Sequence, residues 1–290
     1  MFLLKTEDLT LQLEIVPVSS LVPHEQIISA ASQRLAMEFS NLSNLHHPVI
    51  VDGSSIVLDG NHRVFVFNKL GFKHIAICRI DYFNRHVKLR YWFRLLGNLD
   101  GLGAILAIVE HMGGGFESVP SREVLARALA ENRFSWGVQY GDQFGLIHFS
   151  SGSIGDAVDA YQALAKMQDI LIKQGACVEY IPCNLARDTD TCGEIQKNDV
   201  VIWTPQVSKE MIVAAAKAGK VFAPKTTRHL IPARPLNVNI PGQWLKEDIS
   251  LDEINQRFID HLATKRIRKF GPGQVINGRF YGEKLFVFYD

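Results

Sequence analysis

The segment that most constrains the fold is residues 48–80, where short apolar runs alternate with turn residues. Runs 48–51 and 55–58 have the composition of strands, and Asp52 and Gly53 between them are typical of a hairpin turn. A polar stretch follows at once and predicts the start of a helix that ends at Gly71, a residue typical of helix C-termini. Residues 74–80 predict a further strand. Hairpin, polar turn, helix and strand together indicate a compact α+β unit.

The polar turn in this segment consists of Asp59, Gly60, Asn61, His62 and Arg63. It is predicted at a strand end and a helix N-terminus, where backbone N–H groups and the helix dipole favour an anion. Arg63 offers a planar fork of donors, His62 an imidazole and Gly60 a tight turn. Asp59 carries oxygen ligands of the kind that Mg²⁺ prefers. The alternative is a structural junction in which Asp59 caps the helix.

A second polar segment, Pro23, His24 and Glu25, precedes a helical pattern that runs to about Phe39. A carboxylate at a helix start can accept the proton of a substrate hydroxyl. Glu25 is equally compatible with a first-turn residue that the helix dipole stabilises. The segment alone leaves both interpretations open.

A third polar segment lies late in the chain and contains Lys225, Thr226, Thr227, Arg228 and His229. These residues follow neither a helical nor a strand period. Their hydroxyls, guanidinium and imidazole together suit a carboxylate or a phosphate. A solvated loop with a helix cap is the alternative.

The rest of the chain predicts further helices and strands without an internal repeat. Helical patterns cover 102–112, the stretch from Ser121 to Glu131, 154–173, the stretch from Thr204 and Pro205 to Gly219, and that from Ser250 to about 267. Strands are predicted at 11–17, 136–140, 146–149, 177–181, 199–203 and 285–289. Residues 113–115, all glycine, predict a flexible connector, and Asn277 with Gly278 predicts a hairpin turn. The pattern is α+β with mixed sheets.

Composition limits the partners and the location. Hydrophobic residues make up 47% of the 290 residues, enough for a packed core, and a net charge of +1 argues against broad binding of nucleic acid. No apolar stretch reaches the about 18 residues of a membrane span, and the N-terminus lacks the pattern of a secretion signal, so the expected location is the cytoplasm. Cys78, Cys177, Cys183 and Cys192 form no C-x-x-C pair, which argues against a zinc or redox site.

In this order, the three polar segments resemble the free L-serine kinase family of the ParB/sulfiredoxin superfamily. The matching stretches are 21–25, 59–63 and 224–232, and the resemblance extends over nearly the whole chain. The family includes an archaeal ADP-dependent enzyme and a bacterial ATP-dependent relative from siderophore biosynthesis. The resemblance implies a ParB/sulfiredoxin-like nucleotide-binding domain over 1–97 and a second mixed α+β domain over 98–220. It also implies that a C-terminal segment, 221–290, returns to the active-site cleft.

The resemblance further implies a role for each matching position. Glu25 corresponds to the base that acts on the serine hydroxyl, and Asp59 to the magnesium and phosphate region. Phosphate-binding roles are implied for Asp59, Gly60, Asn61, His62 and Arg63. Binding of serine or phosphoserine is implied for Trp92, Thr226, Thr227, Arg228 and His229, with Arg228 on the carboxylate. Sulfiredoxins carry a catalytic cysteine at the position of Asn61, so Asn61 excludes their sulfinic-acid reduction.

The expected reaction is transfer of a phosphoryl group from ATP or ADP, with Mg²⁺, to L-serine to give O-phospho-L-serine. The sequence leaves the donor, the pathway served and the oligomeric state open. One alternative is a non-enzymatic ParB-like regulator that binds nucleotide or DNA, which would show a basic helix-turn-helix in 102–131. Another is a haem-responsive regulator, although the chain has no C-x-x-C-H motif.

Overall fold

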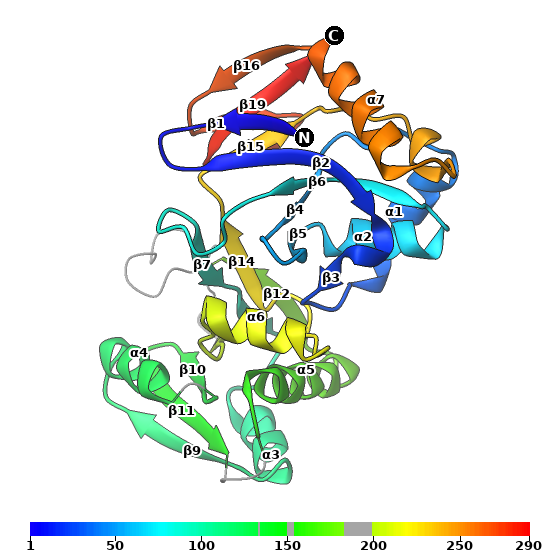
Figure 1. The fold of residues 1–290 in the computed structure, drawn as a ribbon. Coiled ribbons are helices and arrows are strands. Elements are labelled where there is room, and N and C mark those ends of the chain that lie inside the picture. Colours follow the sequence, from blue (N-terminus) through cyan, green and yellow to red (C-terminus); the bar gives the residue numbers. More distant parts are fainter. Residues whose placement is uncertain (133, 150–153, 183–198) are drawn as a thin grey trace. The chain divides into compact units, whose positions relative to one another are not determined.

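The chain crosses twice between two structural units (Figure 1). The computed structural model describes residues 1–132, 134–149, 154–182 and 199–290; Cys183 and Cys192 lie outside the described residues. The first unit contains Met1–Lys88 and His229–Asp290, and the second contains Leu89–Arg228. The late segment of the chain thus shares a unit with the N-terminal residues. Among the described residues, no helix has both the length and the apolar character of a membrane span.

A six-stranded mixed sheet forms the core of the first unit. Its strands, in spatial order, are β1 (Phe2–Lys5), β2 (Thr10–Pro17), β6 (His74–Arg79), β4 (Val49–Val51), β5 (Ile56–Asp59) and β3 (Val22–Pro23). The predicted hairpin joins β4 and β5, and its turn is held by Asp52 Oδ1, which accepts hydrogen bonds from the backbone N–H groups of Ser54 and Ile56 at 2.8 Å each. The strand prediction for this region is confirmed, and it brings the polar turn to the end of a buried strand.

Three helices pack around this sheet. Helices α1 (Ser29–Ser40) and α2 (Asn61–Lys69) share an aromatic contact in which the Phe39 and Phe67 ring centroids are 4.8 Å apart. Helix α7 (Leu251–Ala263) lies against β2, and the Asn255 amide bonds both the N–H and the C=O of Ile15 at 2.8 Å. Ser250 caps α7 as predicted, since its Oγ accepts from the Glu253 N–H at 3.2 Å. Short 3-10 turns, η1 (Val18–Ser20) and η2 (Trp244–Lys246), complete the helical part.

The C-terminal strands of the first unit form two small sheets. One has the order β15 (Ala233–Leu236), β19 (Lys284–Tyr289) and β16 (Arg266–Phe270). The other is the hairpin of β17 (Gln274–Ile276) and β18 (Arg279–Tyr281). Asn277 and Gly278 form its predicted two-residue turn with φ values of 50° and 77°. In Figure 1 the red strand β19 lies beside the blue strand β1, and the Phe2 and Phe288 ring centroids of these strands are 6.0 Å apart.

The second unit is built on an antiparallel sheet covered on both faces. Its order is β12 (Cys177–Ile181), β8 (Phe93–Gly97), β13 (Val200–Trp203), β10 (Trp136–Tyr140), β11 (Gln143–Phe149) and β9 (Gly114–Val119). One face packs against α3 (Gly103–His111), α5 (Ala157–Lys173) and α6 (Lys209–Lys217), with the Tyr161 and Trp136 side chains fully buried. The other face packs against α4 (Arg122–Glu131) through Leu125 and Trp203. Both units are α+β, as predicted.

Three local predictions for the later part of the chain are wrong. The predicted connector 113–115 enters strand β9, because a Cβ on Gly114 would lie 2.7 Å from Val109 Cγ1 and the glycine permits this close packing. The helix predicted from Thr204 and Pro205 begins only at Lys209, with Ser208 as its cap, because Tyr161 Oη donates a hydrogen bond to the Pro205 carbonyl. The late polar segment is not wholly irregular, since β14 (Thr227–Leu230) pairs with β7 (Lys88–Tyr91).

The helices within 102–131 do not form a helix-turn-helix. Strand β9 lies between α3 and α4 in the chain and pairs with β11 inside the sheet. A helix-turn-helix needs two helices joined by a turn of a few residues. The feature that would identify a DNA-binding regulator is therefore absent from this described part of the chain.

Candidate functional site

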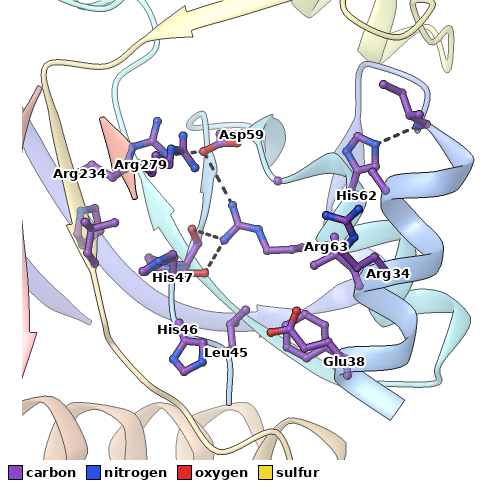
Figure 2. Close-up of a pocket in the computed structure, with 18 of the residues that line it drawn as sticks. Arg34, Glu38, Leu45, His46, His47, Asp59, His62, Arg63, Arg234 and Arg279 are labelled. Carbon is purple, nitrogen blue, oxygen red and sulfur yellow. Dashed lines mark hydrogen bonds and ion pairs between the residues drawn. The ribbon is translucent and has the colours of Figure 1, made fainter. Parts of the chain in front are cut away.

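A cavity of about 780 Å³ opens in the first unit (Figure 2). Its charged lining is dominated by four arginines: Arg34, Arg63, Arg234 and Arg279. Apolar side chains line it as well: Leu35, Phe39, Leu45 and Leu236. A cavity with an apolar part and clustered guanidiniums suits a ligand that joins an apolar ring to an anionic group.

The polar turn 59–63 forms one wall of this cavity. Strand β5 ends at Asp59, Gly60 turns the chain with φ 111° and ψ 20°, and α2 begins at Asn61. The location predicted from the sequence is confirmed. The helix cap is Gly60 rather than Asp59, so the alternative of Asp59 as a helix cap is wrong. The first amides of α2 have no partner within the helix and are suited to bind an anion.

The Asp59 carboxylate is engaged by two arginines. Its Oδ2 accepts a hydrogen bond from Arg234 Nη1 and lies 3.9 Å from Arg63 Nη2. Burial alone would raise the pKa of Asp59, but the Arg234 and Arg63 guanidiniums outweigh it and hold the pKa well below its usual range. Asp59 is therefore a fixed negative charge among positive ones.

The Arg63 guanidinium is held by backbone carbonyl groups as well as by the negative charge of Asp59. Its Nη1 donates to the carbonyl oxygens of His47 and Pro48 at 2.5 and 3.1 Å, and its side chain is 18% exposed. The guanidinium thus has a fixed place beside the start of α2, as Figure 2 shows. A positioned guanidinium of this kind can bind phosphate without first losing side-chain entropy.

His62 connects the polar turn to the segment that carries Glu25. Its Nε2 accepts a hydrogen bond from the backbone N–H of Ile28 at 2.9 Å, so the ring proton of the neutral imidazole is on Nδ1. Ile28 is the residue at which α1 is capped. Glu25 lies four residues before α1 begins, so it is not a first-turn helix residue and that interpretation is wrong.

The early and late polar segments also meet inside the first unit. The His24 side chain is 1% exposed, its Nδ1 donates to the Val57 carbonyl at 2.5 Å, and its ring lies 5.4 Å from that of His229. His229 Nε2 is hydrogen-bonded to Tyr82 Oη at 2.8 Å. Burial lowers the pKa of His24 despite the opposing effect of the neighbouring Glu25 carboxylate, so this imidazole is held neutral. The partly buried Glu25 therefore lies beside the uncharged His24.

The remaining predicted substrate residues form a cluster in the second unit. Trp92 Nε1 donates to the Thr227 carbonyl at 3.0 Å, and the Lys225 ammonium lies 4.6 Å from the centre of the Trp92 ring. The Arg228 guanidinium faces the same ring at 5.7 Å. Thr226 is buried and donates from Oγ1 to the Ala223 carbonyl at 2.7 Å. Trp92 is thus brought together with 225–228, although 135 residues separate it from Thr227.

Several residues that line the cavity lie outside the three polar segments and are not predicted from the sequence as site residues. They are Arg34, His46, His47, Arg234 and Arg279. The adjacent histidines give the clearest signal, but they do not form a metal pair. His46 Nδ1 donates to Asn239 Oδ1 at 2.7 Å, and His47 Nδ1 accepts from the Asn237 N–H at 3.1 Å. Burial, together with the Arg63 charge, lowers the pKa of His47 to about 4.

The described residues do not fit a magnesium ion on Asp59. Mg²⁺ needs oxygen ligands that are open to it, whereas Asp59 already accepts from Arg234 and lies beside Arg63. Within the described ranges, no group of three or more His, Cys, Asp or Glu side chains is arranged for a metal. Asn61 Oδ1 is buried and accepts no hydrogen bond from a described residue, but one neutral oxygen makes no magnesium site.

The chain is similar to known proteins in sequence and in structure. No family model matches the chain. A ParB-like protein of Sulfolobus acidocaldarius is 37% identical over 221 residues, 76% of this chain and 90% of the relative. An ATP-dependent L-serine kinase of Staphylothermus marinus is 22% identical over 245 residues, 80% of this chain and 90% of the relative. An ADP-dependent L-serine kinase of Thermococcus kodakarensis is 24% identical over 233 residues, 78% and 89% of the two chains.

Two solved structures have a similar fold. SbnI with a C-terminal truncation, from Staphylococcus aureus, aligns with a TM-score of 0.68 at 19% identity and covers 87% of this chain and 96% of its own. A free serine kinase in complex with AMP aligns with a TM-score of 0.64 at 20% identity, and the alignment covers 83% of this chain and 95% of the kinase. These likenesses confirm the α+β architecture expected from the sequence.

Proposed function

Because this chain belongs to the ParB-like family and is similar to free serine kinases, we propose that it transfers a phosphoryl group from a nucleotide to free L-serine. The product would be O-phospho-L-serine. One observation carries the proposal: the N-terminus of α2 lies in an arginine-lined cavity, and His62 ties the Glu25 segment to that helix. A phosphate-binding group and a candidate base are thus held in one unit.

The nucleotide is proposed to occupy the cavity. Its base would pack against the apolar lining near Leu35 and Phe39, and its phosphates would bind Arg63 and the amides at the start of α2. Gly60 lets the backbone approach the phosphates, and Asn61 with His62 forms the first turn behind them. Neutralisation of phosphate charge then falls to guanidiniums and amides, because Asp59 is engaged by arginine.

Glu25 is proposed to act as the general base. Its carboxylate would take the proton of the serine hydroxyl while the serine oxygen bonds to the terminal phosphorus. The bond from phosphorus to the bridging oxygen breaks at the same time, and the nucleotide leaves with that electron pair. Burial keeps the neighbouring His24 neutral, so this imidazole brings no positive charge to the proposed site of proton transfer.

Serine is proposed to be held by the late polar segment together with Trp92. Arg228 would pair with the serine carboxylate, since a guanidinium binds a carboxylate through two parallel hydrogen bonds. Thr226, Thr227 and His229 would supply the remaining polar contacts. The hydrogen bond from Trp92 to Thr227 supports this assignment because it fixes the tryptophan on the segment.

The test is direct formation of phosphoserine. Purified protein would be incubated with L-serine, MgCl₂ and either ATP or ADP, and O-phosphoserine measured by mass spectrometry. One nucleotide should support turnover and thereby identify the donor, which differs between the two kinase relatives. Absence of phosphoserine with both nucleotides, in protein shown to bind them, would overturn the proposal.

A further inference from the structure

We infer that Arg234 and Arg279 complete the phosphate site with Arg63, and that Asp59 holds this arginine cluster rather than a metal ion. The inference rests on the proposed function, since it takes the cavity as the nucleotide site. None of the three polar sequence segments contains Arg234 or Arg279. Both nevertheless line the same cavity as the start of α2, and Figure 2 shows them on the same side of Asp59.

Arg234 is fixed by two carboxylates. Its Nη1 donates to Asp59 Oδ2, its Nε donates to Glu283 Oε1 at 2.8 Å, and its side chain is only 11% exposed. These bonds use two of the five N–H donors of a guanidinium. The carboxylates therefore orient the group and leave donors with which it can bind an anion in the cavity.

Arg279 brings positive charge to the cavity without a counter-charge of its own. It lies on β18, its guanidinium is 5.0 Å from the centre of the Tyr281 ring, and it forms no ion pair with a described residue. Its charge helps to lower the pKa of Asp59 and that of Arg63, which places it within electrostatic range of both. An anionic ligand would supply the counter-charge.

The charges around Asp59 favour an anion over a cation. Three guanidiniums face two carboxylates, those of Asp59 and Glu283, so the cluster keeps a net positive charge. A divalent cation on Asp59 would lie beside the Arg234 and Arg63 guanidiniums and be repelled by their like charges. A nucleotide phosphate would instead bind to guanidiniums that the protein already holds in place.

The experiment measures ADP affinity by calorimetry, once with EDTA and once with MgCl₂. Arg279→Ala is the main variant, because Arg279 is exposed and its removal breaks no ion pair among the described residues. Arg268→Ala is the matched control, since Arg268 is also exposed on a strand and faces a tyrosine ring, that of Tyr289, at 5.4 Å. Arg268 does not line the cavity.

We expect the wild type to bind ADP in EDTA. Arg279→Ala should weaken that binding about 10- to 100-fold, the scale of a hydrogen bond to a charged group, without changing the melting temperature. Arg268→Ala should leave the affinity unchanged. Asp59→Asn should leave the ratio of affinities with and without Mg²⁺ as it is in the wild type, because Asp59 holds no metal.

Two results would overturn the inference. One is wild-type ADP affinity in Arg279→Ala. The other is ADP binding that requires Mg²⁺ in the wild type and loses this requirement in Asp59→Asn, as expected of a metal ligand. Phosphoserine formation separates the two proposals. If the wild type forms phosphoserine and either of these two results is found, only the arginine cluster is refuted. An inactive wild type that binds ADP as expected refutes only the serine kinase.

Discussion

Gly60 is the residue of the turn whose backbone angles and close neighbours most strongly require a glycine. Its φ of 111° is one that L-residues rarely adopt, and a Cβ there would lie 2.9 Å from Arg63 Nη2 and 3.0 Å from Val49 Cγ2. Val49 is fully buried in β4 and has little room to move, so the strain should fall on the Arg63 guanidinium. A methyl group at Gly60 should therefore disturb both the backbone and the phosphate site.

The magnitude for Gly60→Ala follows from these two effects. The left-handed backbone costs an alanine about 1–2 kcal/mol, and forced overpacking typically adds about 1–3 kcal/mol. We expect the free energy of unfolding to fall by about 2–5 kcal/mol, measured by chemical denaturation. ADP affinity, measured by calorimetry, should fall at least about tenfold, because Arg63 loses its position.

Two other glycines separate the causes. Gly71 has a φ of 68°, but no described atom lies within 4 Å of a Cβ built there, so Gly71→Ala should cost about 1–2 kcal/mol and leave ADP affinity unchanged. Gly53 has neither a positive φ nor a described atom within 4 Å, so Gly53→Ala should change neither quantity. A Gly60→Ala protein that matched Gly53→Ala in stability and affinity would refute the reasoning.

Three further predictions concern the site. Glu25→Gln should lower kcat about 10²–10⁴-fold while calorimetry shows nearly unchanged nucleotide affinity; a fully active variant would remove Glu25 as the base. Arg63→Ala should weaken ADP binding by about 1.5–3 kcal/mol, and an unchanged affinity would make Arg63 purely structural. Because burial lowers the pKa of His47 from 6.5 to about 4, the unfolded chain takes up a proton that the folded protein does not, so stability present above pH 6.5 is lost as the pH falls towards 4. His47→Asn, which keeps an acceptor for the Asn237 N–H, should flatten this part of the pH profile of the melting temperature; an unchanged profile would exclude His47.

The features predicted correctly from the sequence are those fixed by local interactions. Asp52 binds amides two and four residues ahead, and Ser250 binds an amide three residues ahead. Asn277 and Gly278 adopt the positive φ angles that a two-residue hairpin requires. Each of these needs only its own neighbours in the chain, so a short stretch of sequence is enough to predict it.

The features that were missed depend on partners far away in the chain. Arg234 meets Asp59 across 175 residues, and no periodicity or spacing marks either as the partner of the other. Gly114 looks like a connector because the close approach of Val109 is a tertiary contact. The residues after Thr204 contain a plausible helix start, but the Pro205 carbonyl is bound by a tyrosine from α5. In each case a long-range contact overrides the local preference.

The contacts among the polar segments connect the proposed base with the proposed phosphate site inside the first unit. His62 belongs to the turn that starts α2, and its Nε2 accepts a hydrogen bond from the Ile28 N–H at the start of α1. The same short stretch, 24–28, is held at its other end by the bond from His24 to the Val57 carbonyl on β5, the strand that leads into the turn. Glu25 thus lies between two residues, His24 and Ile28, that are hydrogen-bonded to the element formed by β5, the turn and α2. A displacement of α2 would move His62 and with it the Ile28 amide, so this hydrogen bond links the proposed phosphate site to the segment that carries the proposed base.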